Sequence, residues 1–434
     1  MPGQHYAATL QRQISNLDGL IDWERADRSG GMDVAVNPLS DLLDLLGQPQ
    51  KRFRTVHIAG TKGKGSVGAL IEAGLSRAGL RVGRFSSPHV ERYTERFTLA
   101  CTPFDDAFLG EMIGRALEAR LLAQQKGRVG GEATRFDIEV LASILGFATS
   151  ELEWVVLECG LGGKNDSTNA IDGEIAVLTN VDLEHTAVLG NTKTAIATNK
   201  AGIIKRGSTF VTGVPRMSAE GQAVHEIAAS MQAREVFVDL STAQTIAHRN
   251  LALAEAVLHQ IGERGVRARA DDLPNDPVGG WVLDAQAREA AVLPGRMEIF
   301  TILKPFPLPV VLDGAHVPFN LEQVLSDLNA MPILSGPCTV VAGFASDKAA
   351  SDLIALLAQR AERIIFTKAK NGPPAFDPKA LTLIAKDYGV VCSAVDNAPD
   401  ALADAIHTSH GWILVTGSLH LVGELRAEVR QLTE

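Results

Sequence analysis

The feature that most constrains the fold is the stretch over residues 54–75, where an apolar segment meets a glycine-rich turn and then a helical pattern. Val56 and Ile58 have the spacing of a short strand. Glycines at positions 60, 63 and 65 then turn the chain without side-chain obstruction. The apolar residues that follow fall on one helical face, at Val67, Leu70, Ile71 and Leu75. This order predicts a loop that binds an anion at the helix start, where free N–H groups and the helix dipole favour negative charge.

Two side chains of this loop indicate that the anion is a nucleoside triphosphate. We expect Lys64 to reach the outer phosphates and Ser66 to place its hydroxyl near a Mg²⁺ ion. The sequence of this loop differs from the common G-x-x-x-x-G-K-[ST] motif, because Gly65 separates Lys64 from Ser66. A glycine-rich turn with an incidental lysine is the alternative interpretation, and the flanking strand and helix patterns disfavour it.

Length and composition restrict the class of protein. A chain of 434 residues exceeds one typical core, so two domains are expected. The net charge of −10 argues against a broad nucleic-acid surface. The four cysteines are scattered without a C-x-x-C pair, which fits a reducing cytosol. The first five residues lack the features of a signal peptide, and no apolar run approaches the roughly 20 residues of a membrane span. We therefore expect a cytoplasmic protein with neither nucleic-acid nor membrane partners.

Strand-like segments alternate with helical patterns along the whole chain. They lie near residues 54–59, 81–85, 153–158, 175–181 and 209–213, and again near 310–312, 339–342, 363–366 and 412–416. A proline and a glycine at 294 and 295 interrupt the alternation. We predict an α/β protein with a P-loop-type, mostly parallel sheet domain over residues 1–294, which includes N-terminal helices, and a smaller Rossmann-like α/β domain over 295–434. A polar stretch at 25–31 is interpreted as a surface connection.

Several of these strand-like segments end in polar side chains. The carboxyl ends of parallel strands meet at one edge of a sheet, and functional groups gather there. Ser87 follows the second segment, although Ser-Pro-His by itself is more often a turn than a site. Glu158 ends the third, and an ionised carboxylate at the end of a buried strand is usually paired or metal-bound. Asp182, Glu184 and His185 follow the fourth. The sequence thus predicts a cluster of oxygen and imidazole groups beside the phosphate loop.

In their order along the chain, these motifs resemble the folylpolyglutamate synthase and dihydrofolate synthase group of the Mur ligase superfamily. Any single motif is weak evidence for this family, whereas the ordered set from residue 57 to residue 418 is highly specific for it. The matching pieces are Gly60-Thr61-Lys62-Gly63-Lys64-Gly65-Ser66, Ser86-Ser87-Pro88-His89 with Glu95-Arg96, Leu157-Glu158-Cys159-Gly160-Leu161-Gly162-Gly163 with Asp166-Ser167-Thr168-Asn169, Glu184-His185 with Leu189-Gly190, Lys200-Ala201-Gly202-Ile203-Ile204-Lys205, Pro294-Gly295-Arg296, Asp313-Gly314-Ala315-His316, Asp347-Lys348, and Val415-Thr416-Gly417-Ser418.

The resemblance implies an ATP-dependent amide ligase. A folate or dihydropteroate carboxylate would be phosphorylated by ATP, and the amine of L-glutamate would then displace the phosphate. Phosphoryl transfer of this kind needs charge neutralisation and in-line positioning. The similarity also implies ATP and two Mg²⁺ ions as cofactors, and we expect a monomer.

Site residues follow from the resemblance, position by position. Lys64, His185 and Lys200 are the expected catalytic residues. One Mg²⁺ would be held by Ser87 and Glu158, the second by His185, with Ser66 assisting the metal–phosphate arrangement. Lys200 is expected to be carbamylated and to face the second metal, whereas its residue type alone suggests an exposed helix cation. The expected ATP-binding residues are Gly60, Thr61, Lys62, Gly63, Lys64, Gly65, Ser66, Asn250, Arg296, Asp313 and His316.

The sequence departs from the family pattern at several positions, among them Lys164, Glu184, Asn199 and Val317. Two other functions therefore stay open at this point. One is a Mur-type ligase of cell-wall precursors, and the other is a nucleotide-gated binding protein that has lost catalysis. The Thr-Lys-Gly-Lys-Gly-Ser spelling and the early position of the phosphate loop favour the folate branch over the first. The candidate metal ligands speak against the second.

Overall fold

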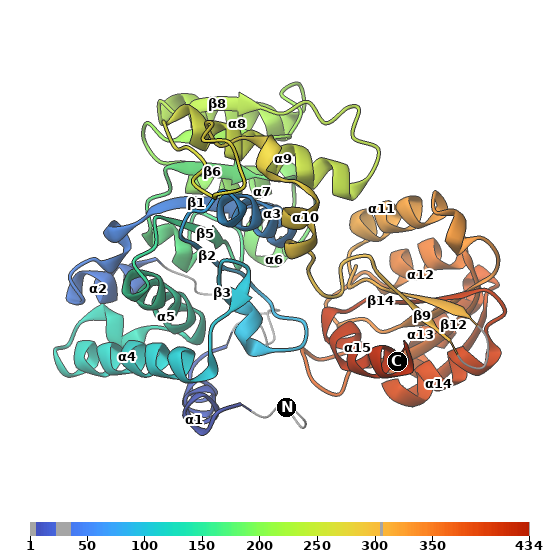
Figure 1. Ribbon diagram of the computed structural model, residues 1–434. Helices are drawn as coiled ribbons and strands as arrows, with labels where there is room; N and C mark the ends of the chain where they lie inside the picture. Colours follow the sequence, from blue (N-terminus) through green and yellow to red (C-terminus); the bar gives the residue numbers. More distant parts are fainter. Residues whose placement is uncertain (1–5, 23–35, 304–306, 434) are drawn as a thin grey trace. The chain divides into compact units, whose positions relative to one another are not determined.

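The computed structural model describes residues 6–22, 36–303 and 307–433 and separates into two compact units, Pro2–Val292 and Leu293–Glu434 (Figure 1). The surface connection predicted at 25–31 lies outside the described residues. Each unit is built around one sheet, so the predicted α/β class with two sheets is confirmed.

The N-terminal unit contains an eight-stranded sheet in the order β4-β3-β2-β5-β1-β6-β7-β8. All neighbours from β2 to β8 run parallel, and the two short strands β3 and β4 pair antiparallel at one edge. The strands are β1 (Arg54–Ala59), β2 (Val82–Phe85), β3 (Phe97–Leu99), β4 (Thr102–Pro103), β5 (Trp154–Glu158), β6 (Ile175–Leu178), β7 (Thr209–Thr212) and β8 (Arg234–Phe237). Strand β6 ends earlier than the segment predicted at 175–181, because Thr179 and Asn180 turn toward the phosphate loop.

Helices cover both faces of this sheet, and strand alternation shows which residues face which helices. A Cβ on Gly68 of helix α3 (Lys64–Arg77) would lie within 3.5 Å of the side chains of Arg84, Ile58 and Val156, so these three residues face α3. Their chain neighbours point the other way. The helices of the unit are α1 (Ala8–Leu17), α2 (Asn37–Leu45), α3 (Lys64–Arg77), α4 (Asp106–Gln125), α5 (Arg135–Thr149), α6 (Thr186–Leu189), α7 (Lys193–Lys200), α8 (Ala219–Ser230), α9 (Ile246–Glu263) and α10 (Ala285–Ala290).

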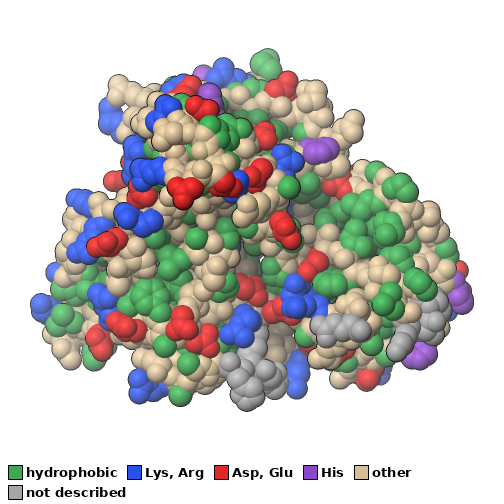
Figure 2. Space-filling view, in the orientation of Figure 1, with side chains coloured by type: hydrophobic (Ala, Val, Ile, Leu, Met, Phe, Trp, Pro, Cys, Tyr) green, Lys and Arg blue, Asp and Glu red, His purple; other side chains and the backbone are tan. Residues whose placement is uncertain are grey.

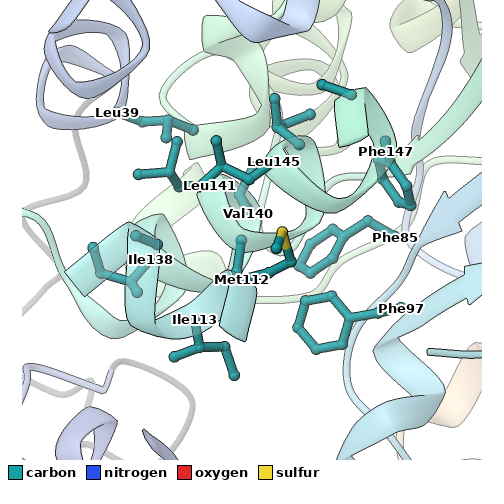
Figure 3. Packing of buried hydrophobic residues seen from close by; sticks show 14 of the residues in the cluster. Leu39, Phe85, Phe97, Met112, Ile113, Ile138, Val140, Leu141, Leu145 and Phe147 are labelled. Carbon is teal, nitrogen blue, oxygen red and sulfur yellow. The ribbon is translucent and has the colours of Figure 1, made fainter. Parts of the chain in front are cut away.

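The face of the sheet opposite to α3 carries a large hydrophobic cluster (Figure 3). Phe85 and Phe97 from the sheet pack with their ring centroids 5.6 Å apart. Met112 of α4 and Leu141 of α5 are fully buried against them. Complete burial of side chains of this size contributes about 1.5–3 kcal/mol each. This packing fixes α4 and α5 on the sheet and leaves its carboxyl edge for the polar loops.

The C-terminal unit contains a six-stranded sheet in the order β13-β12-β11-β14-β10-β9. Its strands are parallel except β9, which pairs antiparallel with β10. The elements are β9 (Glu298–Ile302), β10 (Leu308–Leu312), α11 (Pro318–Asn329), β11 (Cys338–Ala342), α12 (Ala350–Ala358), β12 (Ala361–Lys368), α13 (Pro378–Ala385), β13 (Val391–Asn397), α14 (Ala398–Thr408), β14 (Trp412–Thr416) and α15 (Leu419–Thr433).

The charge distribution on the surface and the composition of the helices both bear on the class of protein. On the face drawn in Figure 2, acidic and basic side chains of the N-terminal unit are interspersed rather than separated by sign. Within the described part of the chain, no helix is both long enough and apolar enough to cross a membrane.

Candidate functional site

The phosphate loop lies between the carboxyl end of β1 and the first turn of α3. Gly63 precedes the helix with φ +82°, a conformation that L side chains rarely adopt. A Cβ on Gly63 would lie 2.7 Å from Oδ1 of Asn250, so α9 brings Asn250 directly to the loop. Within the described residues, no side chain caps the start of α3. Its first N–H groups and the helix dipole therefore provide the anion-binding geometry that the sequence predicts.

Three lysines surround this loop. Lys64 Nζ donates to the carbonyl oxygen of Gly60 at 3.2 Å and lies 3.9 Å from Glu158 Oε1. Lys200 Nζ donates to the same carbonyl oxygen at 2.9 Å. Lys62 Nζ pairs with Glu184 Oε1 at 2.7 Å. Lys62 and Lys64 thus bring cationic groups to the loop at the helix start, and Lys200 lies against the same loop.

Lys200 is buried, with 4% of its surface exposed. Burial, and after it the nearby charge of Lys64, lowers the pKa of Lys200 to about 7, although Glu184 acts in the opposite direction. A lysine with such a pKa exists largely as the neutral amine near pH 8. A neutral amine is a nucleophile, and this form is the one that reacts with carbon dioxide. Burial therefore rules out the exposed helix cation that the residue type suggested.

The candidate metal ligands lie at or just beyond the carboxyl ends of neighbouring strands: Glu158 is the last residue of β5, and Ser66 lies in the first turn of α3. Strands β2, β5, β1 and β6 are adjacent and parallel, so Ser87, Glu158, Ser66 and His185 follow the same edge of the sheet. Glu158 is paired in register with Ile58 and is 7% exposed. Hydroxyl and carboxylate oxygens are the ligands that Mg²⁺ prefers, so the oxygen donors of Ser66, Ser87 and Glu158 fit that ion.

His185 occupies a left-handed backbone conformation, with φ +52°. Its Nε2 lies 3.8 Å from Glu184 Oε1, the carboxylate that also binds Lys62. Among the described residues, no three His, Cys, Asp or Glu side chains are grouped to hold a metal. The predicted set instead combines serine hydroxyls, one carboxylate, one imidazole and a modified lysine.

A buried network that sequence reasoning missed supports the loop after Glu158. Asp166 accepts from the N–H of Leu161 at 2.7 Å and from the hydroxyl of Thr168. The Thr168 hydroxyl lies 2.8 Å from His57 Nε2. Burial lowers the pKa of His57 to about 3, so this imidazole stays neutral at physiological pH. The motif Asp166-Ser167-Thr168 is one of those that resemble the family, but only the fold shows that its Thr168 hydroxyl contacts His57 of β1.

Three other predicted ATP-binding residues belong to the C-terminal unit, where the pairing of β9 with β10 brings them together. Asp313 accepts from the N–H of Met297 at 2.9 Å and from that of Ala315 at 2.8 Å. His316 Nδ1 donates to the carbonyl oxygen of Gly314 at 2.8 Å. Arg296 lies in the turn held by the hydrogen bond that the Met297 N–H donates to Asp313. These residues therefore form one compact group within their unit.

Comparisons with known proteins agree with this architecture. Residues 295–419 match the family of Mur ligase glutamate ligase domains. The chain is 31% identical to folylpolyglutamate synthase of Lacticaseibacillus casei, covering 89% of this chain and 92% of that protein. It is 30% identical to dihydrofolate synthase/folylpolyglutamate synthase of Escherichia coli strain K12, covering 96% and 95%.

A solved structure shows the same fold over nearly the whole chain. It is the bifunctional folylpolyglutamate synthase/dihydrofolate synthase of Yersinia pestis complexed with AMPPNP and a Mn ion, with a TM-score of 0.77 and 25% identity over 97% of this chain and 98% of that one. The chain thus belongs to the folylpolyglutamate synthase/dihydrofolate synthase family of ATP-dependent ligases.

Proposed function

We propose that this enzyme joins L-glutamate to a folate-type carboxylate at the expense of ATP, through an acyl phosphate. The observation that supports this most is the phosphate loop, where Lys64 stands at the start of α3 within 3.9 Å of Glu158. Such an arrangement neutralises a triphosphate and places a metal-binding carboxylate beside it. The enzyme acts as a cytoplasmic monomer, and its four cysteines, all free thiols, fit a reducing compartment.

The two parts of the chain have different roles in this proposal. Residues 1–294 bind ATP, and residues 295–434 form the glutamate ligase domain. In the first part the nucleotide phosphates contact the loop and Asn250, whose amide reaches Gly63. In the second, the group around Asp313 contacts the nucleotide. The proposed ATP-binding residues are Gly60, Thr61, Lys62, Gly63, Lys64, Gly65, Ser66, Asn250, Arg296, Asp313 and His316.

Two Mg²⁺ ions belong to the proposal, because the donor set along the sheet edge offers hard oxygen atoms. Ser87 and Glu158 would hold the first, with Ser66 assisting the metal–phosphate arrangement, and His185 and a carbamate on Lys200 would hold the second. Bound Mg²⁺ supplies charge neutralisation on the transferring phosphoryl group. The lowered pKa of Lys200 supports carbamylation, since only the neutral amine can add carbon dioxide.

The chemistry has two steps. A carboxylate oxygen of the folate-type substrate attacks the γ-phosphorus of ATP, and the bond to the β–γ bridging oxygen breaks to release ADP. The neutral amine of L-glutamate then attacks the acyl carbon, phosphate leaves, and the nitrogen loses a proton. Lys64 and the first N–H groups of α3 stabilise the charge that develops on the transferring phosphoryl group.

An ADP-release assay tests this proposal. The purified enzyme is incubated with ATP and Mg²⁺, with either dihydropteroate or tetrahydrofolate, in the presence and absence of L-glutamate. We expect sustained ADP release only when a folate-type acid and L-glutamate are both present. ADP release that needs neither would indicate a plain ATPase, and no release under any condition would indicate a nucleotide-binding protein without ligase activity.

A further inference from the structure

The loop that follows β6 lies directly against the phosphate loop. This contact arises from the sheet order, because β1 and β6 are parallel neighbours and Ala59 pairs with Leu178 at their carboxyl ends. Two further contacts extend the pairing beyond the strands. The N–H of Thr61 donates to the carbonyl oxygen of Asn180 at 3.1 Å, and the N–H of Asp182 donates to the Thr61 hydroxyl at 3.0 Å.

Thr179 and Asn180 bind both polar groups of the Lys62 backbone. The N–H of Lys62 donates to Asn180 Oδ1 at 2.9 Å, and Asn180 Nδ2 donates back to the Lys62 carbonyl oxygen at 3.0 Å. The same carbonyl oxygen accepts from the Thr179 hydroxyl at 2.6 Å. Two side chains therefore fix the orientation of the peptide groups on either side of Lys62.

The position of Thr179 also explains the glycine at position 60. A Cβ on Gly60 would lie 1.8 Å from the Thr179 hydroxyl oxygen. The hydroxyl therefore occupies the space that a side chain at position 60 would need. Only glycine, which has no side chain, fits there. Thr179 is 3% exposed, so its hydroxyl has a fixed environment.

The orientation of the Lys62 carbonyl matters for an anion site. Carbonyl oxygens carry partial negative charge and repel phosphate, whereas N–H groups attract it. The two donors from Thr179 and Asn180 hold the Lys62 carbonyl oxygen against the β6 loop. The chain then reaches Gly63 and the start of α3, where the first N–H groups are available to the phosphates.

We propose that Thr179 and Asn180 are positioning residues for the nucleotide: they hold the phosphate loop in its anion-binding shape before ATP arrives. The inference rests on the proposed function of this loop. Neither side chain needs to touch the nucleotide, because both act through the peptide groups of Lys62. Their loss should change how well the triphosphate is bound and oriented, in addition to any effect on stability.

The experiment compares the variant Thr179→Val, which removes the hydroxyl at almost constant volume, with Thr179→Ser, which keeps it. Thr212→Val is the matched control. Thr212 is equally buried at the end of β7, and its hydroxyl also donates to a backbone carbonyl, that of Leu178, at 3.1 Å. Asn180→Asp is the second test variant; it keeps the acceptor for the Lys62 N–H and loses the donor to the carbonyl. For each variant, kcat, KM for ATP, the Kd of ADP and the Tm are measured.

We expect Thr179→Val and Asn180→Asp to lower kcat/KM for ATP and to weaken ADP binding by about tenfold or more, because small displacements of a positioned group have effects of that size. Thr179→Ser should stay within about threefold of the parent enzyme. Thr212→Val should change Tm as much as Thr179→Val while leaving KM for ATP unchanged.

Two results would overturn the inference. The first is a normal KM for ATP and normal ADP binding in both Thr179→Val and Asn180→Asp. The second is an equal loss in Thr179→Val and Thr212→Val, which would show that any missing hydroxyl in the sheet has this effect. Lys64→Ala is assayed in parallel: if it binds ADP and turns over normally, the proposed nucleotide site itself is wrong, and the inference falls with it.

Discussion

Replacing the buried Lys200 by methionine should make the N-terminal unit more stable while it abolishes ligation. Lys200 is 4% exposed, and its pKa falls from 10.5 to about 7 on folding. A change of that size corresponds to about 5 kcal/mol of unfavourable free energy for the charged amine in the folded state. Methionine has a similar length and carries no charge, so Lys200→Met removes this penalty.

The size of this gain in stability depends on pH. The direction of the pH dependence follows from how many protons Lys200 binds in the folded and unfolded states. Between pH 7 and pH 10.5 the unfolded state holds the proton on Lys200 and the folded state does not. The parent enzyme therefore gains stability as pH rises through this range, and the penalty is fully present below pH 7. The variant also loses the hydrogen bond to Gly60, which is worth about 1 kcal/mol. We expect Lys200→Met to be about 2–4 kcal/mol more stable near pH 7, with the difference vanishing toward pH 10.5.

The assay is calorimetric unfolding at pH 7 and at pH 10, in buffer free of metal ions and bicarbonate so that Lys200 is unmodified. For a unit of this size, the expected gain corresponds to a rise in Tm of roughly 5–10 °C at pH 7. Lys193→Met is the control, because Lys193 lies on the same helix with its side chain 45% exposed. Its effect should stay within about 0.5 kcal/mol at both pH values. A Lys200→Met enzyme that is no more stable than the parent at pH 7, or a difference that does not change with pH, would refute the reasoning.

Three further predictions concern catalysis. Lys64→Ala should abolish ligation with an unchanged melting curve, since Lys64 neutralises phosphate charge whose loss adds about 3–4 kcal/mol to the barrier; near-normal turnover would remove the loop from the mechanism. Glu158→Ala should lose Mg²⁺-dependent activity more severely than Asp182→Ala in a Mg²⁺ titration of the rate, and the reverse order would show that the ligand assignment is wrong. Lys200→Arg and Lys200→Ala should both be inactive, and a short carboxylic acid added to Lys200→Ala should restore part of the rate; an active Lys200→Arg enzyme would exclude the carbamate.

Much of the fold and of the phosphate loop could be predicted from the sequence. The strand, glycine turn and helix around Lys64 are determined locally, by residue periodicity and by glycines that permit the turn. The strand ends at Glu158 and Ser87 were predictable for the same reason, because apolar segments stop where polar residues begin. Local patterns also sufficed for the α/β class and for two separate sheets.

Other parts of the site depend on contacts between distant segments. The amino-acid sequence around Thr179 and Asn180 does not show that their side chains bind the backbone of Lys62, because that contact requires β1 and β6 to be neighbours. The burial of Lys200 has the same origin: its residue type suggests an exposed cation, and only the packed sheet edge removes it from water. The edge strand β8 (Arg234–Phe237) was not predicted, because its polar residues lack the apolar run of the central strands.

The central claim is that a folate-type carboxylate attacks ATP to form an acyl phosphate, and oxygen transfer tests it most directly. The carboxylate oxygens of the substrate are labelled with ¹⁸O, and the phosphate released during ligation with L-glutamate is analysed by mass spectrometry. The mechanism predicts one ¹⁸O atom in each phosphate released, because the carboxylate oxygen that attacks phosphorus leaves with the phosphate. Phosphate without the label, formed while the glutamate conjugate accumulates, would contradict the acyl phosphate mechanism.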